Sequence, residues 1–202
     1  MNLSCIRRII LPLALILPGN FANAQKLDFL IPHTATLQYA GSIGFFSAGA
    51  GYSFFGKDKG SLDISYGFVP KAVGGPLNIL AAKFAWRPFL IPVSNWGTLF
   101  PINPGMFISY HMGSNYSRFW DKNTYEKGYY WWSTALRPHI SLSTEIKINA
   151  AKLLGQSKIK YISLYNEFNT NELYLISYIQ NRHALRLHQI IKMGIGAKFY
   201  FQ

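Results

Sequence analysis

Three side chains of one segment could together perform nucleophilic chemistry. His139, Ser141 and Glu145 all occupy odd positions within residues 132–148. In an extended strand alternate residues share a face, which would place His139 and Ser141 ~6–7 Å apart. A hydroxyl nucleophile beside an imidazole base, with a carboxylate that orients the base, is the arrangement found in hydrolytic triads. The segment therefore carries a candidate catalytic group.

Glu145 is the weakest member of this candidate group. On a straight strand it would lie ~13 Å from His139, which is too far for contact. Glu167 or Asp63 would have to supply the acid in its place. The alternative interpretation is structural, with the same side chains lining a polar interior, and we favour it.

The alternation that places these residues on one face extends through most of the chain. In residues 132–148, even positions carry apolar side chains such as Ile140 and Leu142, whereas odd positions carry mostly charged, polar or small ones. Such alternation indicates a β-strand, and ~9–11 residues are enough for a tilted strand to cross a bilayer. The same pattern predicts seven further strands, at residues 34–40, 45–54, 61–68, 80–87, 106–113, 161–167 and 191–201.

Eight strands joined in sequence predict an all-β fold, a closed antiparallel up-and-down transmembrane β-barrel. Half of the 202 residues are hydrophobic, yet no apolar run after residue 24 is long enough for a membrane-spanning helix. Unpaired backbone groups are costly in lipid, so the sheet has to close. An eight-stranded barrel has an interior filled by side chains rather than a wide channel. We expect one barrel domain, residues 25–202, integral to a bacterial outer membrane.

The N-terminal residues 1–24 have the order of a cleavable secretory signal peptide. Arg7 and Arg8 precede an apolar run, and a small-residue exit, Ala22-Asn23-Ala24, follows it;. We predict cleavage after Ala24. The single cysteine, Cys5, lies before the apolar run, so it is no lipoprotein acceptor, and the mature chain has no thiol for a disulfide or a thiolate metal site;.

Connection lengths predict that both termini are periplasmic, because periplasmic turns are short and outer loops are long in such barrels. The expected outer connections are residues 41–42, 70–76, 113–130 and 170–185, and the expected inner ones are 56–60, 91–104 and 149–157. Residues 172–182 predict a short amphipathic helix over the outer mouth. Aromatic and basic residues of these loops form a candidate contact surface, namely Arg118, Trp120, Tyr125, Tyr174 and Tyr178;.

Charged residues at lumen-facing positions predict a network of ion pairs. A buried charge needs a partner, and neighbouring strands can supply one. The predicted lumen polar network contains Asp63, Lys83, Arg87, His111, Arg137, Glu145, Glu167 and Lys192, and Lys147 and Lys198 share the same parity. Cations outnumber carboxylates, and we place the excess near the barrel ends.

The net charge of +12 raises the question of an anionic partner. A secreted chain does not meet nucleic acid, so we expect none. Outer-membrane lipid and lipopolysaccharide are the expected partners, with the barrel-assembly machinery during insertion and other envelope proteins as further candidates. We predict no metal and no cofactor, because two facing histidines, His111 and His139, are too few ligands for a metal.

Several segments resemble a family of small eight-stranded outer-membrane β-barrel proteins of Bacteroidota. They are residues 37–44 (LQYAGSIG), 51–55 (GYSFF), 65–71 (SYGFVPK), 165–168 (YNEF), 175–179 (LISYI) and 193–197 (MGIGA). The resemblance implies the fold and the outer-membrane location, but no assigned activity. The last strand also resembles the signal read by the barrel-assembly machinery, except that Gln202 follows the aromatic Phe201.

A fainter resemblance concerns the His-x-Ser pattern, which is similar to that of small barrels that deacylate lipid A. The residue after Ser141 is Leu142, where that family has Asn, and Glu145 is closer in sequence than that family's acid. We therefore predict a non-enzymatic barrel that serves as a structural, binding or accessory component of the envelope. The alternatives are a lipid A acyl hydrolase that uses His139 and Ser141, and a narrow pore.

Overall fold

The computed structural model describes residues 31–56, 58–113, 116, 133–150, 154–155 and 158–201. The predicted signal peptide and the loop residues Arg118, Trp120 and Tyr125 lie outside the described residues. The described chain is almost entirely β-structure, with three short helices in its connections.

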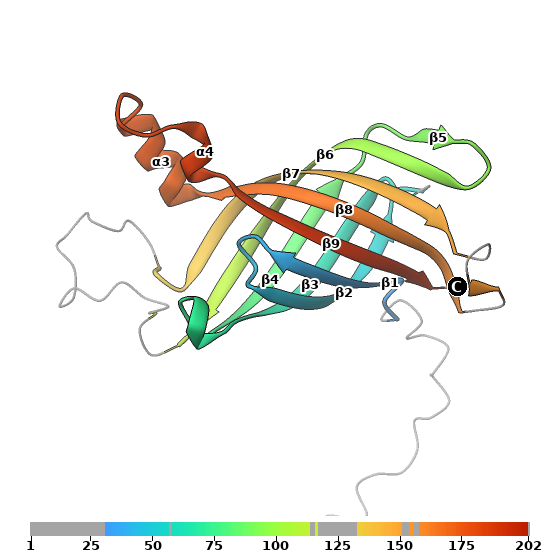
Figure 1. Cartoon of the computed structure of the whole chain (residues 1–202), viewed down its shortest axis with the longest axis horizontal. Coiled ribbons are helices and arrows are strands. Elements are labelled where there is room, and N and C mark those ends of the chain that lie inside the picture. Colours follow the sequence, from blue (N-terminus) through green and yellow to red (C-terminus); the bar gives the residue numbers. More distant parts are fainter. Residues whose placement is uncertain are drawn as a thin grey trace, which may run out of the picture. The chain divides into compact units, whose positions relative to one another are not determined.

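Eight antiparallel strands form a closed barrel (Figure 1), as the alternation predicts. Each strand pairs with its neighbours in sequence, and the first pairs with the last, so that the sheet closes. The strands are β1 (Thr34–Ala40), β2 (Phe46–Phe54), β3 (Gly60–Val69), β4 (Leu77–Trp86), β6 (Gly97–Met112), β7 (Leu136–Asn149), β8 (Ile159–Asn171) and β9 (Lys192–Phe201).

The predicted inner turn at residues 91–104 is wrong. A ninth strand, β5 (Ile91–Val93), forms a hairpin with the start of β6, which begins as early as Gly97. β5 pairs only with β6 and stands outside the closed ring. The register of β6 against β7 shifts between Phe100 and Asn103. This bulge interrupts the period-two pattern, so the alternation does not reveal this part of the strand.

The connections are distributed between the two ends of the barrel as their order predicts. The helices η2 (Lys71–Val73), α3 (Glu172–Gln180) and α4 (Leu187–Ile190) lie in the β3–β4 and β8–β9 connections. Figure 1 shows α3 and α4 beyond the ends of β8 and β9, at the barrel end opposite to β5 and the C-terminus. We call the end with α3 the helix mouth and the end with β5 the hairpin mouth. No helix among the described residues is long and apolar enough to cross a membrane.

Small residues on the inner face leave room for the large charged side chains. A Cβ at Gly51 would meet the carboxylate of Asp63, and a Cβ at Gly196 would meet the ring of Tyr165. Both glycines lie in strands, where glycine is otherwise unfavourable. They are therefore placed where a lumen side chain comes close to the backbone of a neighbouring strand.

Candidate functional site

Three ion pairs cross the lumen and connect strands that are not neighbours. Lys198 Nζ lies 2.6 Å from Asp63 Oδ2, joining β9 to β3, and Lys83 Nζ lies 2.8 Å from Glu167 Oε2, joining β4 to β8. In the sheet, two strands separate the members of each of these pairs. Arg87 follows β4 and contacts Glu145 of β7 through Nη2, at 2.9 Å. The lumen is therefore filled by side chains that hold opposite walls together.

Two tyrosines complete this buried network. Tyr200 donates a hydrogen bond of 2.8 Å to Glu145 Oε1, and Arg87 Nε donates one of 3.0 Å to the other oxygen of the same carboxylate. Tyr165 donates a 2.9 Å hydrogen bond to Gln38, and the ammonium group of Lys83 lies 5.2 Å from the centre of the Tyr165 ring. Hydrogen bonds of this kind offset the desolvation of buried charges.

The hairpin mouth adds a contact that the sequence pattern did not predict. Lys147 pairs with Asp58, and Arg87 Nη1 donates a 2.9 Å hydrogen bond to the backbone oxygen of Asp58. Asp58 lies in the turn between β2 and β3 and has a positive φ of 59°. Strand parity says nothing about a turn residue, so only the three-dimensional structure identifies this partner.

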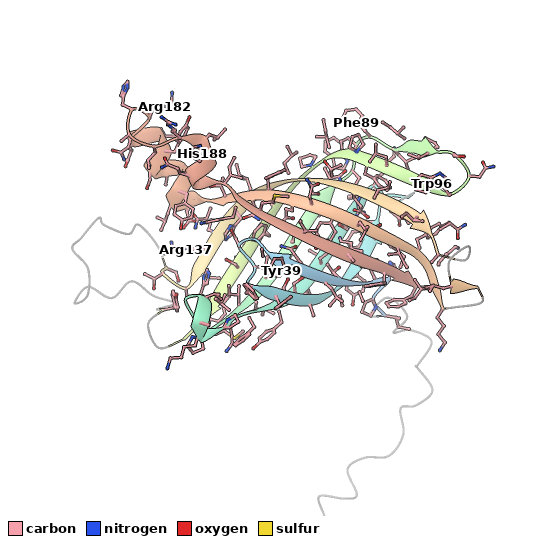
Figure 2. The ribbon with its side chains drawn as sticks, in the orientation of Figure 1. Tyr39, Phe89, Trp96, Arg137, Arg182 and His188 are labelled. Atoms are coloured by element: carbon pink, nitrogen blue, oxygen red, sulfur yellow. The ribbon has the colours of Figure 1, made fainter. Side chains whose placement is uncertain are left out.

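The hairpin mouth is hollowed by a cleft of about 370 Å³. Figure 2 shows Trp96 and Phe89 beside β5 at this end. Trp96, Phe100 and Tyr161 line the cleft together with the Lys147–Asp58 pair. Phe100, which lines the cleft, is almost completely buried.

The helix mouth holds the remaining predicted lumen residues. Arg137 Nη1 lies 2.7 Å from Glu172 Oε1, so the first turn of α3 is tied to β7. His111 Nδ1 lies 3.3 Å from the backbone oxygen of Ala135. Lys192 has the parity of the lumen but is exposed, and its ammonium group lies 5.7 Å from the ring centre of Tyr174. Lys192 therefore belongs to the mouth and not to the buried network.

No hydrogen bond in the described part of the chain links the candidate catalytic residues His139, Ser141 and Glu145. His139 Nε2 lies 3.0 Å from Ser109 Oγ on β6, and its ring stacks on Phe107 with 4.2 Å between the ring centres. In the described part of the chain, Nδ1 of His139 has no hydrogen-bond partner, so no carboxylate orients the ring. Glu145 is engaged by Arg87 and Tyr200. Ser109 is fully buried, so this serine is not placed to meet a substrate.

Among the described residues, no group of three or more His, Asp, Glu or Cys side chains could hold a metal ion. Phe107, and not His111, stands opposite His139 in the register of β6 and β7. Of the predicted contact residues, Tyr174 and Tyr178 lie on α3, and Tyr174 is the more exposed of the two.

The outer surface of the barrel is apolar where that of a soluble protein would be polar. Outward-facing Ile, Leu, Phe, Met and Tyr side chains are roughly half exposed on every strand of the ring, for example Leu37, Phe46, Ile64, Leu80, Met106, Ile140, Leu164 and Ile195. Charged side chains occupy the inner face instead. The molecule is thus an eight-stranded β-barrel with a charged, closed interior and an apolar wall.

Comparisons with known proteins give no relative for this barrel. No protein-family model matches the chain, and neither a curated protein nor a solved structure matches it. The resemblance to small barrels of Bacteroidota therefore stays a prediction from the quoted segments.

Proposed function

We propose that the protein is an integral outer-membrane β-barrel without catalytic activity, which serves as a structural, binding or accessory component of the cell envelope. The barrel fold is compatible with this location. The proposal includes the removal of residues 1–24 and periplasmic N- and C-termini. It assigns functional contacts to the helix mouth and not to the lumen.

One observation carries this proposal, namely the inverted distribution of polar and apolar side chains. Asp63, Glu145 and Glu167 are buried inside the ring, whereas large apolar side chains cover its outside. Soluble monomers rarely expose contiguous apolar surface on this scale. Transmembrane barrels have an apolar outer band around a polar interior, so lipid is the surrounding that this wall fits.

The absence of catalysis is supported by how the lumen residues are used. Glu145 and Glu167 are paired with Arg87 and Lys83, and His139 contacts a buried serine. A triad needs an acid in contact with the base and a nucleophile within reach of substrate. The first condition is not met, because Nδ1 of His139 has no hydrogen-bond partner in the described part of the chain, so no contact there favours the acyl hydrolase.

The location and the lack of activity can be tested in the same bacterial cells. Wild-type protein and a Ser141→Ala variant are expected in the outer-membrane fraction, and both should migrate faster on gels before heating than after it. Lipid A mass spectra should be identical with either variant and without the protein. Recovery in the soluble fraction would contradict the location. Loss of acyl chains that requires Ser141 would contradict the proposal of a non-enzymatic barrel.

The filled lumen also predicts that the barrel does not conduct ions. In planar bilayers the reconstituted protein should give no resolved single-channel conductance, because the Arg87–Glu145 and Lys83–Glu167 pairs obstruct the lumen. The control replaces all four residues of these two pairs by alanine, which removes both obstructions and should produce small, flickering currents. Stable wild-type openings would instead favour the narrow pore.

A further inference from the structure

The connection between β8 and β9 combines apolar exposure with an unbalanced positive charge. No side chain of α3 is buried, although six of its nine residues are Leu, Ile or Tyr. Tyr174 and Ile179 are exposed on this helix, and Leu187 is exposed on α4. A helix that is apolar all round is normally covered by protein or lipid, and this one projects beyond the strand ends (Figure 1).

The same connection also carries exposed cations. Arg182, Arg186 and Lys192 are exposed, and Figure 2 shows Arg182 at the far tip of the connection and His188 near α4. Residues 173–202 contain no Asp or Glu at all. Glu172, the carboxylate just before them, is engaged by Arg137. No carboxylate of this segment therefore neutralises its exposed cations, which leaves them open to anions from outside the segment.

The connection is also held in a defined place on the barrel. Asn171 caps α3 by accepting a 2.9 Å hydrogen bond from the backbone N–H of Tyr174, and Glu172 fixes the first turn to β7. At the other end of α3, the backbone N–H groups of Ala184 and Leu185 donate to the carbonyl of Asn181. α3 itself carries no Lys or Arg, and the cations come from the residues that follow it. Exposed apolar side chains and cations on one segment are together the groups that bind at a membrane surface.

We propose that the segment from Glu172 to Lys192 docks on the surface of the surrounding bilayer, where its cations bind the phosphate groups of anionic lipid. Tyr174, Ile179 and Leu187 enter the boundary between headgroups and acyl chains, and Arg182, Arg186 and Lys192 pair with phosphates. Lipopolysaccharide presents such phosphates in an outer leaflet. The inference rests on the proposed membrane location and names the partner of the helix mouth.

A single fluorescent label on α3 tests this docking. The full chain with Cys5→Ser and Ile179→Cys carries one thiol, to which an environment-sensitive dye is attached. After refolding into vesicles, we expect a blue shift in phosphatidylcholine mixed with phosphatidylglycerol or lipid A, and a smaller shift in phosphatidylcholine alone. Salt at about 1 M, where the Debye length is about 3 Å, should reduce the difference.

Charge reversal identifies the residues responsible. Arg182→Glu with Arg186→Glu should lower the ratio of docked to undocked label by at least about tenfold, since each cation near an anionic surface contributes about fivefold. The matched control reverses two exposed lysines of the hairpin mouth, Lys158→Glu and Lys160→Glu, and should leave the ratio unchanged. A dye at Val73→Cys, which is exposed on η2 at the helix mouth, should not respond to lipid charge.

Three outcomes would overturn the inference. The blue shift of the dye could be the same with neutral and anionic lipid. Alternatively, reversing Lys158 and Lys160 could reduce docking as much as reversing Arg182 and Arg186. Inorganic phosphate alone could produce the full shift, which would indicate a phosphate site and not a lipid surface. Heat-modifiable mobility is measured on the same vesicles. Failure to insert therefore counts against the membrane location, whereas insertion without a charge response counts against the docking alone.

Discussion

Glu145→Ala should lower the free energy of unfolding by about 3–5 kcal/mol, the usual effect of removing one partner from a buried ion pair. The substitution leaves the guanidinium of Arg87, which is 1% exposed, without its carboxylate. It also removes the acceptor of the Tyr200 hydroxyl. Urea unfolding of the refolded protein in lipid vesicles, followed by tryptophan fluorescence, measures the change.

Two further variants separate the lost pair from other effects. Replacing both partners, by Arg87→Met with Glu145→Met, should recover most of the lost stability, because an apolar pair of similar size has no unpaired charge. Glu172→Ala is the matched carboxylate control at the helix mouth. It should cost less, since Arg137 can turn toward water there. A loss below about 1 kcal/mol for Glu145→Ala would mean that water reaches Arg87, and the closed lumen would be wrong.

The sequence alternation predicts which charges enter the lumen but not which charges meet. Asp63, Lys83, Glu167 and Lys198 all have inward parity, and all are buried as expected. Their pairing across the lumen depends on the stagger of the strands around the ring, which is a property of the whole sheet. No local pattern specifies that Asp63 faces Lys198 rather than Lys83.

The candidate triad shows the same limit on a smaller scale. Parity correctly places His139 and Ser141 on the inner face, but the neighbours of His139 come from the register between β6 and β7. That register sets Phe107 opposite His139 and brings Ser109 to its ring nitrogen. Since register arises from pairing between two segments, the His-x-Ser spacing within one strand could not reveal the competing serine.

Irregular positions account for the other failures of prediction. Asp58 is a turn residue with positive φ, and the start of β6 contains Pro101, Pro104 and a bulge. These features remove the period-two signal locally, so the sequence pattern predicts a turn where the structure has a strand. The helix predicted within residues 172–182 is present as α3, because its apolar residues no longer alternate and Asn171 supplies an N-cap, but its apolar side chains are not confined to one face, so it is not the amphipathic helix expected;.

Ile64→Arg should destabilise the protein by about 2–4 kcal/mol in a bilayer, the cost of an arginine on the lipid face near the membrane midplane. Ile64 lies at the middle of β3, and its side chain points outward with 49% exposure. In a water-soluble barrel the same position would be a surface site, where a substitution changes stability by no more than about 0.5 kcal/mol. The two surroundings therefore predict different results for one variant.

Phe54→Arg provides the depth control for this measurement. Phe54 also faces outward but ends β2, at the level expected for the membrane interface, where an arginine costs only about 0–1 kcal/mol. Urea unfolding in vesicles should show the larger loss for Ile64→Arg alone. Equal losses at the two positions, or no loss at Ile64, would mean that lipid does not surround the wall. The inverted surface would then have to be covered by protein.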